Sequence, residues 1–370
     1  MSSDLIVFGC VLALRLIVPL WIPKVPLPAI IACLVIDGVD QTIFQKWTDL
    51  DLTNYQSYDK ALDVYYLTIA YLSTMRNWDN PVAFNASRFL LYYRLVGVML
   101  FEFLHARALL LIFPNTFEYF FIFFEAVRTR WRSANVSRGL VLGAVAAIWI
   151  VIKLPQEWWI HIAQRDVTDE LAAHPEVIPV LVALGALLLV AAWWVLTRKA
   201  PPPDHPFRLT VDDPFGDAEL QRRVQPAGTG RFFDLVLLEK AAMVSLVAVI
   251  FSQILPGIQS TPLQLAIGIG TLVVANTAVS EWLVRRGAGW RTATRQFFAV
   301  GAINIGLVVA ADLLLPIRNG EIRLGNTLFF MLLVTLLVTL FDRYRPIYVA
   351  REQERWDALA MRARMQMLRG

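Results

Sequence analysis

Long runs of apolar residues alternate with short polar segments along most of the 370-residue chain. A helix needs about 20 apolar residues to cross a bilayer core, and the stretches 177–197 and 241–280 match or exceed that length. Because backbone groups in lipid must be hydrogen-bonded within their own segment or in a closed barrel, runs of this length favour helices. The pattern therefore predicts an all-α, polytopic integral membrane protein.

We expect about 11 transmembrane helices. They are predicted at 5–22, 25–45, 59–75, 89–105, 108–126, 138–153, 177–197, 233–255, 262–284, 296–315 and 325–341. The chain then divides into an N-terminal five-helix half (1–137), two further helices (138–197), a polar, proline-rich cytoplasmic linker (198–232), a four-helix C-terminal half (233–341) and a basic tail (342–370). For the tail we expect a helix on the inner membrane surface, with an ordinary solvated tail as the alternative.

Composition and charge agree with this description and orient it. Hydrophobic residues make up 57% of the chain and charged residues 17%, against roughly 45–50% and 25% in soluble domains. Of the 34 Lys and Arg residues, 24 fall in one set of alternate loops and the tail, and seven in the other set. Because basic loops stay in the cytoplasm, we expect the N-terminus outside and the C-terminus in the cytoplasm.

The same numbers bound the partners and the location. The net charge of +4 is explained by basic loops, so we expect the lipid bilayer and no nucleic acid as a partner. A homo-oligomer or a membrane partner subunit stays open. Cys10 and Cys33 each lie in an apolar run and predict no disulfide framework. The basic residues are 28 Arg and only six Lys, a bias typical of GC-rich bacteria, so we expect the plasma membrane (bacterial inner membrane).

Charged residues inside the apolar runs concentrate in the first five expected spans. A charge at mid-membrane costs at least about 2.5–3.5 kcal/mol on insertion scales, so seven of them in this part of the chain point to a functional site there. They are Arg15, Asp37, Asp40, Asp63, Arg94, Glu102 and Glu118.

The spacing of the acids places them together. Asp37 and Asp40 are three residues apart, and Asp59 and Asp63 four apart, so each pair shares a helix face. The expected topology brings these faces to one depth below the outer surface, which predicts a carboxylate-rich cavity that opens away from the cytoplasm. The candidate ion- or substrate-binding residues are Asp37, Asp40, Tyr58, Asp59, Asp63, Arg94, Glu102, His105, Asn115 and Glu118.

Each element of this prediction has a plainer alternative. Asp37 and Asp40 could cap a short span in the headgroup region, Asp59 and Lys60 could form an exposed helical turn, and Arg94 and Glu102 could form a structural pair. The plain interpretation is favoured outright for two further segments and two histidines. They are the aromatic run 117–124, expected to face lipid; the Trp-rich segment 157–166, expected to be an outer interfacial helix; and His161 and His174, expected at the surface.

The chemistry available is that of oxygen ligands. The four His residues show no zinc-binding spacing, and the chain has no nucleophile elbow or phosphate-binding loop. Carboxylates and Tyr hydroxyls can hold a hard divalent cation or carry protons, so the cofactor is unknown, with a divalent cation on the four aspartates as one alternative. We therefore expect a transporter or channel that binds H⁺ or a metal cation. The alternatives are a metal-dependent membrane enzyme acting on a lipid or lipid-linked substrate, and a non-catalytic membrane subunit.

One resemblance supports the enzyme alternative. The pattern Asp37-x-x-Asp40 followed by Asp59-x-x-x-Asp63 resembles the four-aspartate motif of CDP-alcohol phosphotransferases, which implies divalent metal binding and transfer of a phosphoalcohol on the cytoplasmic side. It covers 27 residues and departs from the family pattern. Gln41 and Tyr55 stand at glycine positions, the Ala-Arg pair is missing, and the second aspartate pair comes one residue late.

Overall fold

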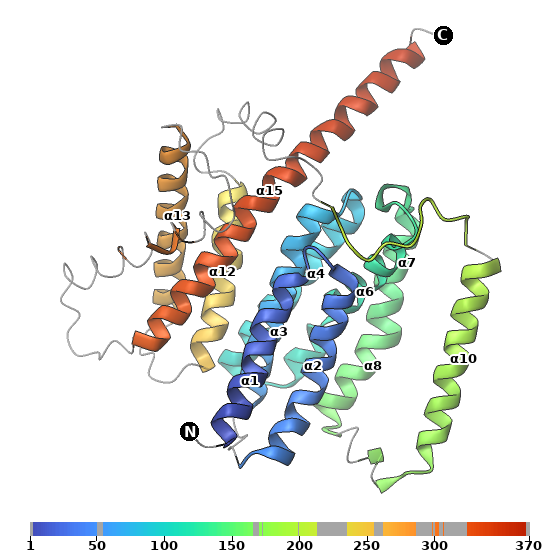
Figure 1. The fold of residues 1–370 in the computed structure, drawn as a ribbon, viewed down its shortest axis with the longest axis vertical. Coiled ribbons are helices and arrows are strands. Elements are labelled where there is room, and N and C mark those ends of the chain that lie inside the picture. Colours follow the sequence, from blue (N-terminus) through green and yellow to red (C-terminus); the bar gives the residue numbers. More distant parts are fainter. Residues whose placement is uncertain are drawn as a thin grey trace.

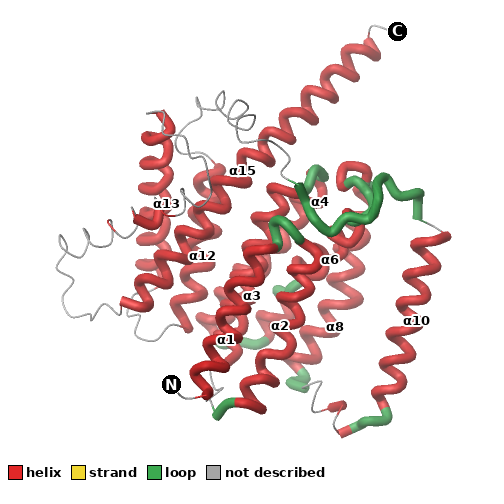
Figure 2. The backbone as a smooth tube through the Cα atoms, in the orientation of Figure 1, coloured by secondary structure: helices red, strands yellow, loops and turns green. Residues whose placement is uncertain are grey.

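The computed structural model describes residues 3–49, 55–165, 170–171, 173–198, 200–212, 235–254, 262–285 and 324–367, together with 298, 300–302 and 306. Within these residues the chain is helical and contains no strand (Figures 1 and 2), which confirms the all-α prediction. The helices run up and down as a bundle with roughly aligned axes (Figure 1).

The helical elements follow one another with few long interruptions. The first half contains α1 (Ser3–Ile17), the 3₁₀ turn η1 (Val18–Trp21), α2 (Pro26–Trp47), α3 (Tyr55–Asn77), α4 (Pro81–Leu104), α5 (Ala108–Ile112), α6 (Thr116–Arg128) and the 3₁₀ turn η2 (Ser133–Asn135). Then come α7 (Arg138–Ala147), the π-helical η3 (Ile148–Lys153), α8 (Leu154–Glu157), the π-helical η4 (Trp158–Ile162), α10 (Val177–Arg198), α12 (Leu235–Ile254), α13 (Pro262–Arg285) and α15 (Leu324–Met367).

Five of these helical stretches are long and apolar enough to cross a membrane. They are Ser3–Trp21, Pro26–Trp47, Ala108–Arg128, Arg138–Ile162 and Leu235–Ser252. Shorter apolar helices cover Val177–Leu187 and Ala266–Ala278. The span expected at 296–315 lies outside the described residues except for 298, 300–302 and 306. Several helices are thus suited to a membrane-embedded protein.

The central helix of the bundle is α3, which is too polar to be counted among those five. It packs against α1, α2, α4, α6, α12 and α15, and every residue from 61 to 78 is buried. Protein rather than lipid therefore surrounds this helix, and its hydroxyls and carboxylates find partners on its neighbours. Because α12 and α15 also pack on α3, the C-terminal helices share the core of the N-terminal half.

The aromatic run 117–124 belongs to this core, so the prediction that it faces lipid is wrong. Phe117, Phe120, Phe121 and Phe124 are all fully buried, and three of them pack around Trp78 at the end of α3 with ring centroids 4.3–6.0 Å away. Helix α6 is covered by α2, α3, α4 and α7, which leaves this face no access to lipid.

The predicted end of the sixth span at residue 153 is also wrong. Helix continues from Arg138 to Ile162 through the two π-helical segments, so 157–162 extends that helix instead of forming a separate interfacial one. Proline interrupts the hydrogen bonds of a regular α-helix, and Pro155 lies within this continuous helical stretch. Here it lies in the first turn of α8, directly after the wider π-helical turns of η3.

Basic residues and connecting segments meet at one end of the bundle, which we call the basic end. The backbone N–H of Val211 donates to Lys24, that of Arg208 to Thr129, and that of Asp204 to Arg130, at 2.9–3.0 Å. The segment 200–212 therefore runs across the ends of the helices (Figure 2). The tail continues α15 as a helix through Pro346, and its far part projects from the bundle (Figure 1).

Candidate functional site

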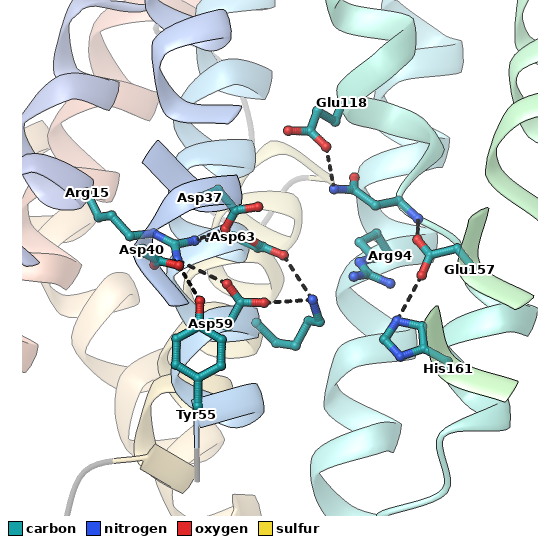
Figure 3. Close-up of polar contacts among 12 residues, drawn as sticks. Arg15, Asp37, Asp40, Tyr55, Asp59, Asp63, Arg94, Glu118, Glu157 and His161 are labelled. Atoms are coloured by element: carbon teal, nitrogen blue, oxygen red, sulfur yellow. Dashed lines mark hydrogen bonds and ion pairs between the residues drawn. The ribbon is translucent and has the colours of Figure 1, made fainter. Parts of the chain in front are cut away.

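Four aspartates from two helices converge on one arginine of a third. The Nη1 atom of Arg15, on α1, donates to Asp40 and to Asp59, the latter at 3.0 Å. The Nη2 atom donates to Asp37 and to Asp63, the latter at 3.0 Å. Each terminal nitrogen thus bridges one acid of α2 to one acid of α3 (Figure 3). We call these five residues the Arg15 cluster.

Two side chains complete this cluster. Lys60 Nζ lies 2.9 Å from Asp59 and 3.5 Å from Asp63, and the Tyr55 hydroxyl donates to Asp40. Asp40 is fully buried, and Arg15 and Asp63 are each 4% exposed. These ion pairs overturn the plainer interpretations, because Asp40 is no headgroup cap and Asp59 with Lys60 is no exposed turn.

The cluster lies well inside the bundle. At 1.5 Å per residue, Asp37 lies about 16 Å along α2 and Asp63 about 12 Å along α3. With every group ionised, the four carboxylates form ion pairs with Arg15 and Lys60 among the described residues, so two negative charges within the cluster have no ion-pair partner of their own. Buried charges without a counter-charge are costly, so these carboxylates favour the uptake of protons or of a cation.

Three of the acids are also arranged as ligands. Oxygen atoms of Asp37, Asp59 and Asp63 all lie within 4.8 Å of one another. Carboxylate oxygens are the ligands that divalent cations such as Mg²⁺ and Ca²⁺ prefer. Arg15 contacts the same three carboxylates, so a bound cation and the guanidinium would compete for them.

A second polar group lies beside the first, beyond Tyr66 of α3. The Tyr66 hydroxyl donates to Glu118 on α6 at 2.5 Å, and the Asn115 side chain donates to the other oxygen of Glu118 at 3.0 Å. The break between α5 and α6 leaves the backbone N–H of Asn115 free of the helix, and it donates to Glu157 at 3.1 Å. Glu157 in turn contacts His161 at 3.0 Å (Figure 3).

The stretch formed by α8 and the π-helical η4 carries Glu157 and His161. Glu157 and His161 are four residues apart and face into the bundle, where His161 is 3% exposed. The prediction that His161 lies at the surface is therefore wrong, whereas His174 is exposed as expected. Because α8 and η4 prolong the helix, both residues reach the level of Asn115.

Two buried basic side chains, those of Arg94 and Lys153, lie near these polar groups. Arg94, on α4, is 1% exposed, and its Nη1 donates to the backbone oxygen of Phe113 at 3.0 Å. Its Nε has no hydrogen-bond partner among the described residues. Lys153 is 4% exposed and lies over the ring of Tyr119 at 3.9 Å. Neither has a carboxylate within ion-pair distance in the described part of the chain.

Three of the predicted site residues stand apart from these contacts. His105 is exposed and adopts a left-handed conformation that ends α4. The Tyr58 ring packs against Phe8 and Phe44, and its hydroxyl has no hydrogen-bond partner among the described residues. Glu102 is buried, and one of its carboxylate oxygens has no hydrogen-bond partner in the part of the chain that is described. It shares α4 with Arg94, two turns away, and the two form no ion pair. The alternative of a structural Arg94–Glu102 pair is therefore wrong.

The site also contains residues that the sequence did not single out as members. From sequence, Arg15 is identified only as an interior charge and Lys60 only as part of a helical turn. A lone Arg in an apolar run opposite several acids is the signal that marks a counter-ion. For Glu157 and His161 the signal is their four-residue spacing, hidden by the misplaced helix end.

Comparisons with known proteins do not assign this chain to a family. No family model, no curated protein and no solved structure matches this chain. The function must therefore be argued from the geometry itself.

Proposed function

We propose that this protein is a membrane transporter in which the Arg15 cluster binds H⁺ or a metal cation and couples its binding to movement across the membrane. The observation that carries this proposal is the charge imbalance of the cluster: four buried or half-buried aspartates on two helices face one Arg and one Lys. A site of this kind gains most by taking up positive charge.

The geometry also suggests how uptake would change the structure. Arg15 ties α1 to both α2 and α3 through pairs of carboxylates. Protonation of one carboxylate, or its capture by a cation, weakens its ion pair with the guanidinium. Helix α1 is then held less firmly against α2 and α3. A ligand that binds one arrangement better than another shifts their populations, which is the elementary step of coupled transport.

The proposal carries an orientation and a location with it. We propose about eleven crossings with the basic end in the cytoplasm, in line with the distribution of Lys and Arg, in a bacterial inner membrane. One helix break supports transport, since discontinuous helices line the sites of many transporters. It lies at 113–115 between α5 and α6, inside the apolar stretch Ala108–Arg128.

The experiment is flux into proteoliposomes made with the purified full-length protein. We expect proton uptake, read by a trapped pH-sensitive dye, or divalent cation uptake, read by a trapped metal-sensitive dye, above that of empty liposomes. Asp37→Asn removes one of the unbalanced charges, and its side chain is 22% exposed, so we expect normal folding with flux lowered at least about tenfold. Asp357→Asn, an exposed acid of the tail, is the matched control.

Flux unchanged by Asp37→Asn, with folding intact, contradicts the proposal. So does wild-type protein that moves neither protons nor Mg²⁺ or Mn²⁺.

A second candidate is favoured by the oxygen atoms of Asp37, Asp59 and Asp63, which are close enough to share a divalent metal. We propose as the alternative a metal-dependent enzyme acting on a lipid-linked substrate. The enzyme alternative is supported if the protein shows no flux but turns over such a substrate in a metal-dependent reaction that Asp37→Asn abolishes. Loss of neither property would instead indicate a structural membrane subunit.

A further inference from the structure

A separate cavity lies at the basic end, about 16 Å along α2 from Asp37 of the Arg15 cluster. A cavity of about 270 Å³ opens there between the first turn of α2, the end of α6, the segment 205–212 and α15. Its volume is at the lower limit of small-molecule sites, which suits a small ligand or a headgroup.

The charged side chains of this cavity are mostly basic. Arg128, Arg208, Arg351 and His205 line it, together with the acids Glu125 and Asp212. Glu125 is already engaged, because it accepts hydrogen bonds from Arg128 at 2.7–2.8 Å and from the Trp78 indole at 2.7 Å. This leaves Asp212 as the acid among the lining residues whose side chain could oppose an anion.

Two of the arginines have donors to spare. Arg351 contacts Asp79 through Nε at 3.2 Å, whereas its Nη1 is buried without a hydrogen-bond partner in the described part of the chain. Arg208 is held by its backbone N–H, which donates to Thr129 at 3.0 Å. Its side chain is exposed and makes no ion pair with any described residue.

The electrostatic environment is unfavourable for these cations as they stand. Burial lowers the pKa of the Arg351 guanidinium below its usual range, Asp79 opposes this change, and the nearby Arg128 and Arg76 add to it. Arginines crowded in this way are stabilised by a bound anion. The planar fork of a guanidinium fits phosphate oxygens in particular.

We propose that this cavity binds a phosphate group, with Arg208 and the free Nη1 of Arg351 as its main donors. Two sources supply that chemistry: the headgroup of an anionic phospholipid, and a soluble phosphate compound. Basic pockets between membrane helices are known to hold phospholipid headgroups. The proposal is independent of transport by the Arg15 cluster.

The test measures thermal unfolding of the full-length protein in detergent with three additions at matched concentration: inorganic phosphate, short-chain phosphatidylglycerol and short-chain phosphatidylcholine. A ligand that binds only the folded state raises the midpoint with its concentration. We expect phosphatidylglycerol to raise the midpoint. Phosphatidylcholine should not raise it, because its choline cation cancels the charge of its phosphate and would itself face the arginines. An equal shift with inorganic phosphate identifies a soluble compound as sufficient, whereas a shift with the lipid alone identifies the headgroup.

Arg208→Gln is the decisive variant, because its exposed side chain is not needed for folding. We expect its affinity for phosphatidylglycerol or phosphate to fall about tenfold, the loss of one charge-assisted hydrogen bond. Arg351→Gln should act in the same direction. Arg138→Gln removes an exposed Arg from the first turn of α7, outside the cavity, and should leave binding unchanged. No shift with either anion, an equal shift with phosphatidylcholine, or equal effects of Arg138→Gln and Arg208→Gln would overturn the proposal.

Discussion

At the scale of single residues, Arg15 is the shared ion-pair partner of all four aspartates of the site. Its two terminal nitrogens contact four carboxylates, so it holds together acids that would otherwise repel one another. Buried ion pairs contribute little net free energy when intact, but removing one partner strands the other. The residue is therefore a sensitive position for stability as well as for function.

Arg15→Gln should lower the free energy of unfolding by about 3–5 kcal/mol, the range for a stranded buried charge. Thermal unfolding in detergent, followed by circular dichroism, measures the loss.

The control for this prediction is charge compensation. Arg15→Gln combined with Asp37→Asn restores the charge balance of the wild type and should recover a large part of the lost stability. A double variant no more stable than Arg15→Gln alone would show that charge repulsion is not the cause.

At the scale of elements, irregular helices bring the site residues to their places. The break at 113–115 frees the backbone of Asn115, and the π-helical turns carry His161 inward. A close approach accompanies the break: a Cβ atom added at Gly97 of α4 would collide with the side chain of Phe113. Glycine is needed there for space.

Gly97→Ala should therefore destabilise the protein by about 1–3 kcal/mol, the usual cost of overpacking. Gly143→Ala in α7 is the matched control, since nothing lies within 4 Å of the added atom. It should be neutral or stabilising by up to about 1 kcal/mol, because Ala favours helix. Chemical or thermal unfolding of the two variants gives the comparison. Equal destabilisation would contradict the assigned role of Gly97.

The segment 200–212 offers a second test at this scale. The backbone N–H of Arg132 and the Asn135 side chain donate to Asp204 at 2.8 and 3.0 Å and lower the pKa of that carboxyl. A lowered folded-state pKa means that the contact stabilises fully above the unfolded value of 3.8 and is lost as the pH falls through the folded value.

Hydrogen exchange of residues 129–137, corrected for the intrinsic rate, should therefore increase as the pH falls below 3.8, the unfolded pKa of Asp204. At neutral pH, Asp204→Ala should reproduce the increase and Asp357→Ala should not. Equal exchange rates in the wild type and in Asp204→Ala would show that the hydrogen bonds to Asp204 do not hold this segment in place.

At the scale of the whole molecule, the basic end is the feature that the orientation depends on. Segments far apart in the sequence meet there, as the backbone contacts of 204–211 with Lys24 and with the end of α6 show. Loops that share one end of a bundle must lie on one side of the membrane. A single well-placed label therefore reports on all of them.

The proposed orientation predicts opposite labelling of two single cysteines, introduced after Cys10→Ser removes the exposed native thiol. Glu176→Cys, before α10, should react with a membrane-impermeant maleimide on intact cells. Ala134→Cys, at the basic end, should react only after permeabilisation. Both positions are exposed. The reverse result would invert the proposed orientation.

How far the sequence predicts this protein differs between fold and site. Long apolar runs specify helices because lipid leaves the backbone no other partner, and the pairs Asp37/Asp40 and Asp59/Asp63 were identifiable by spacing alone. Two prolines in helical stretches have different effects on the helix. Pro114 does lie at a break, whereas Pro155 is accommodated by π-helical turns, and local sequence does not distinguish these outcomes because they depend on neighbouring helices.

The helical class and the membership of the aspartates were thus determined by local properties: apolar run length, residue spacing and the cost of charge in lipid. Tertiary structure decided which side chains face each other. It put polar α3 at the centre, buried the α6 aromatics, placed Arg15 among the acids and turned His161 inward. The physical reason is that such pairings join residues from different helices, and the rotation and depth of one helix against another are set by packing over its whole length.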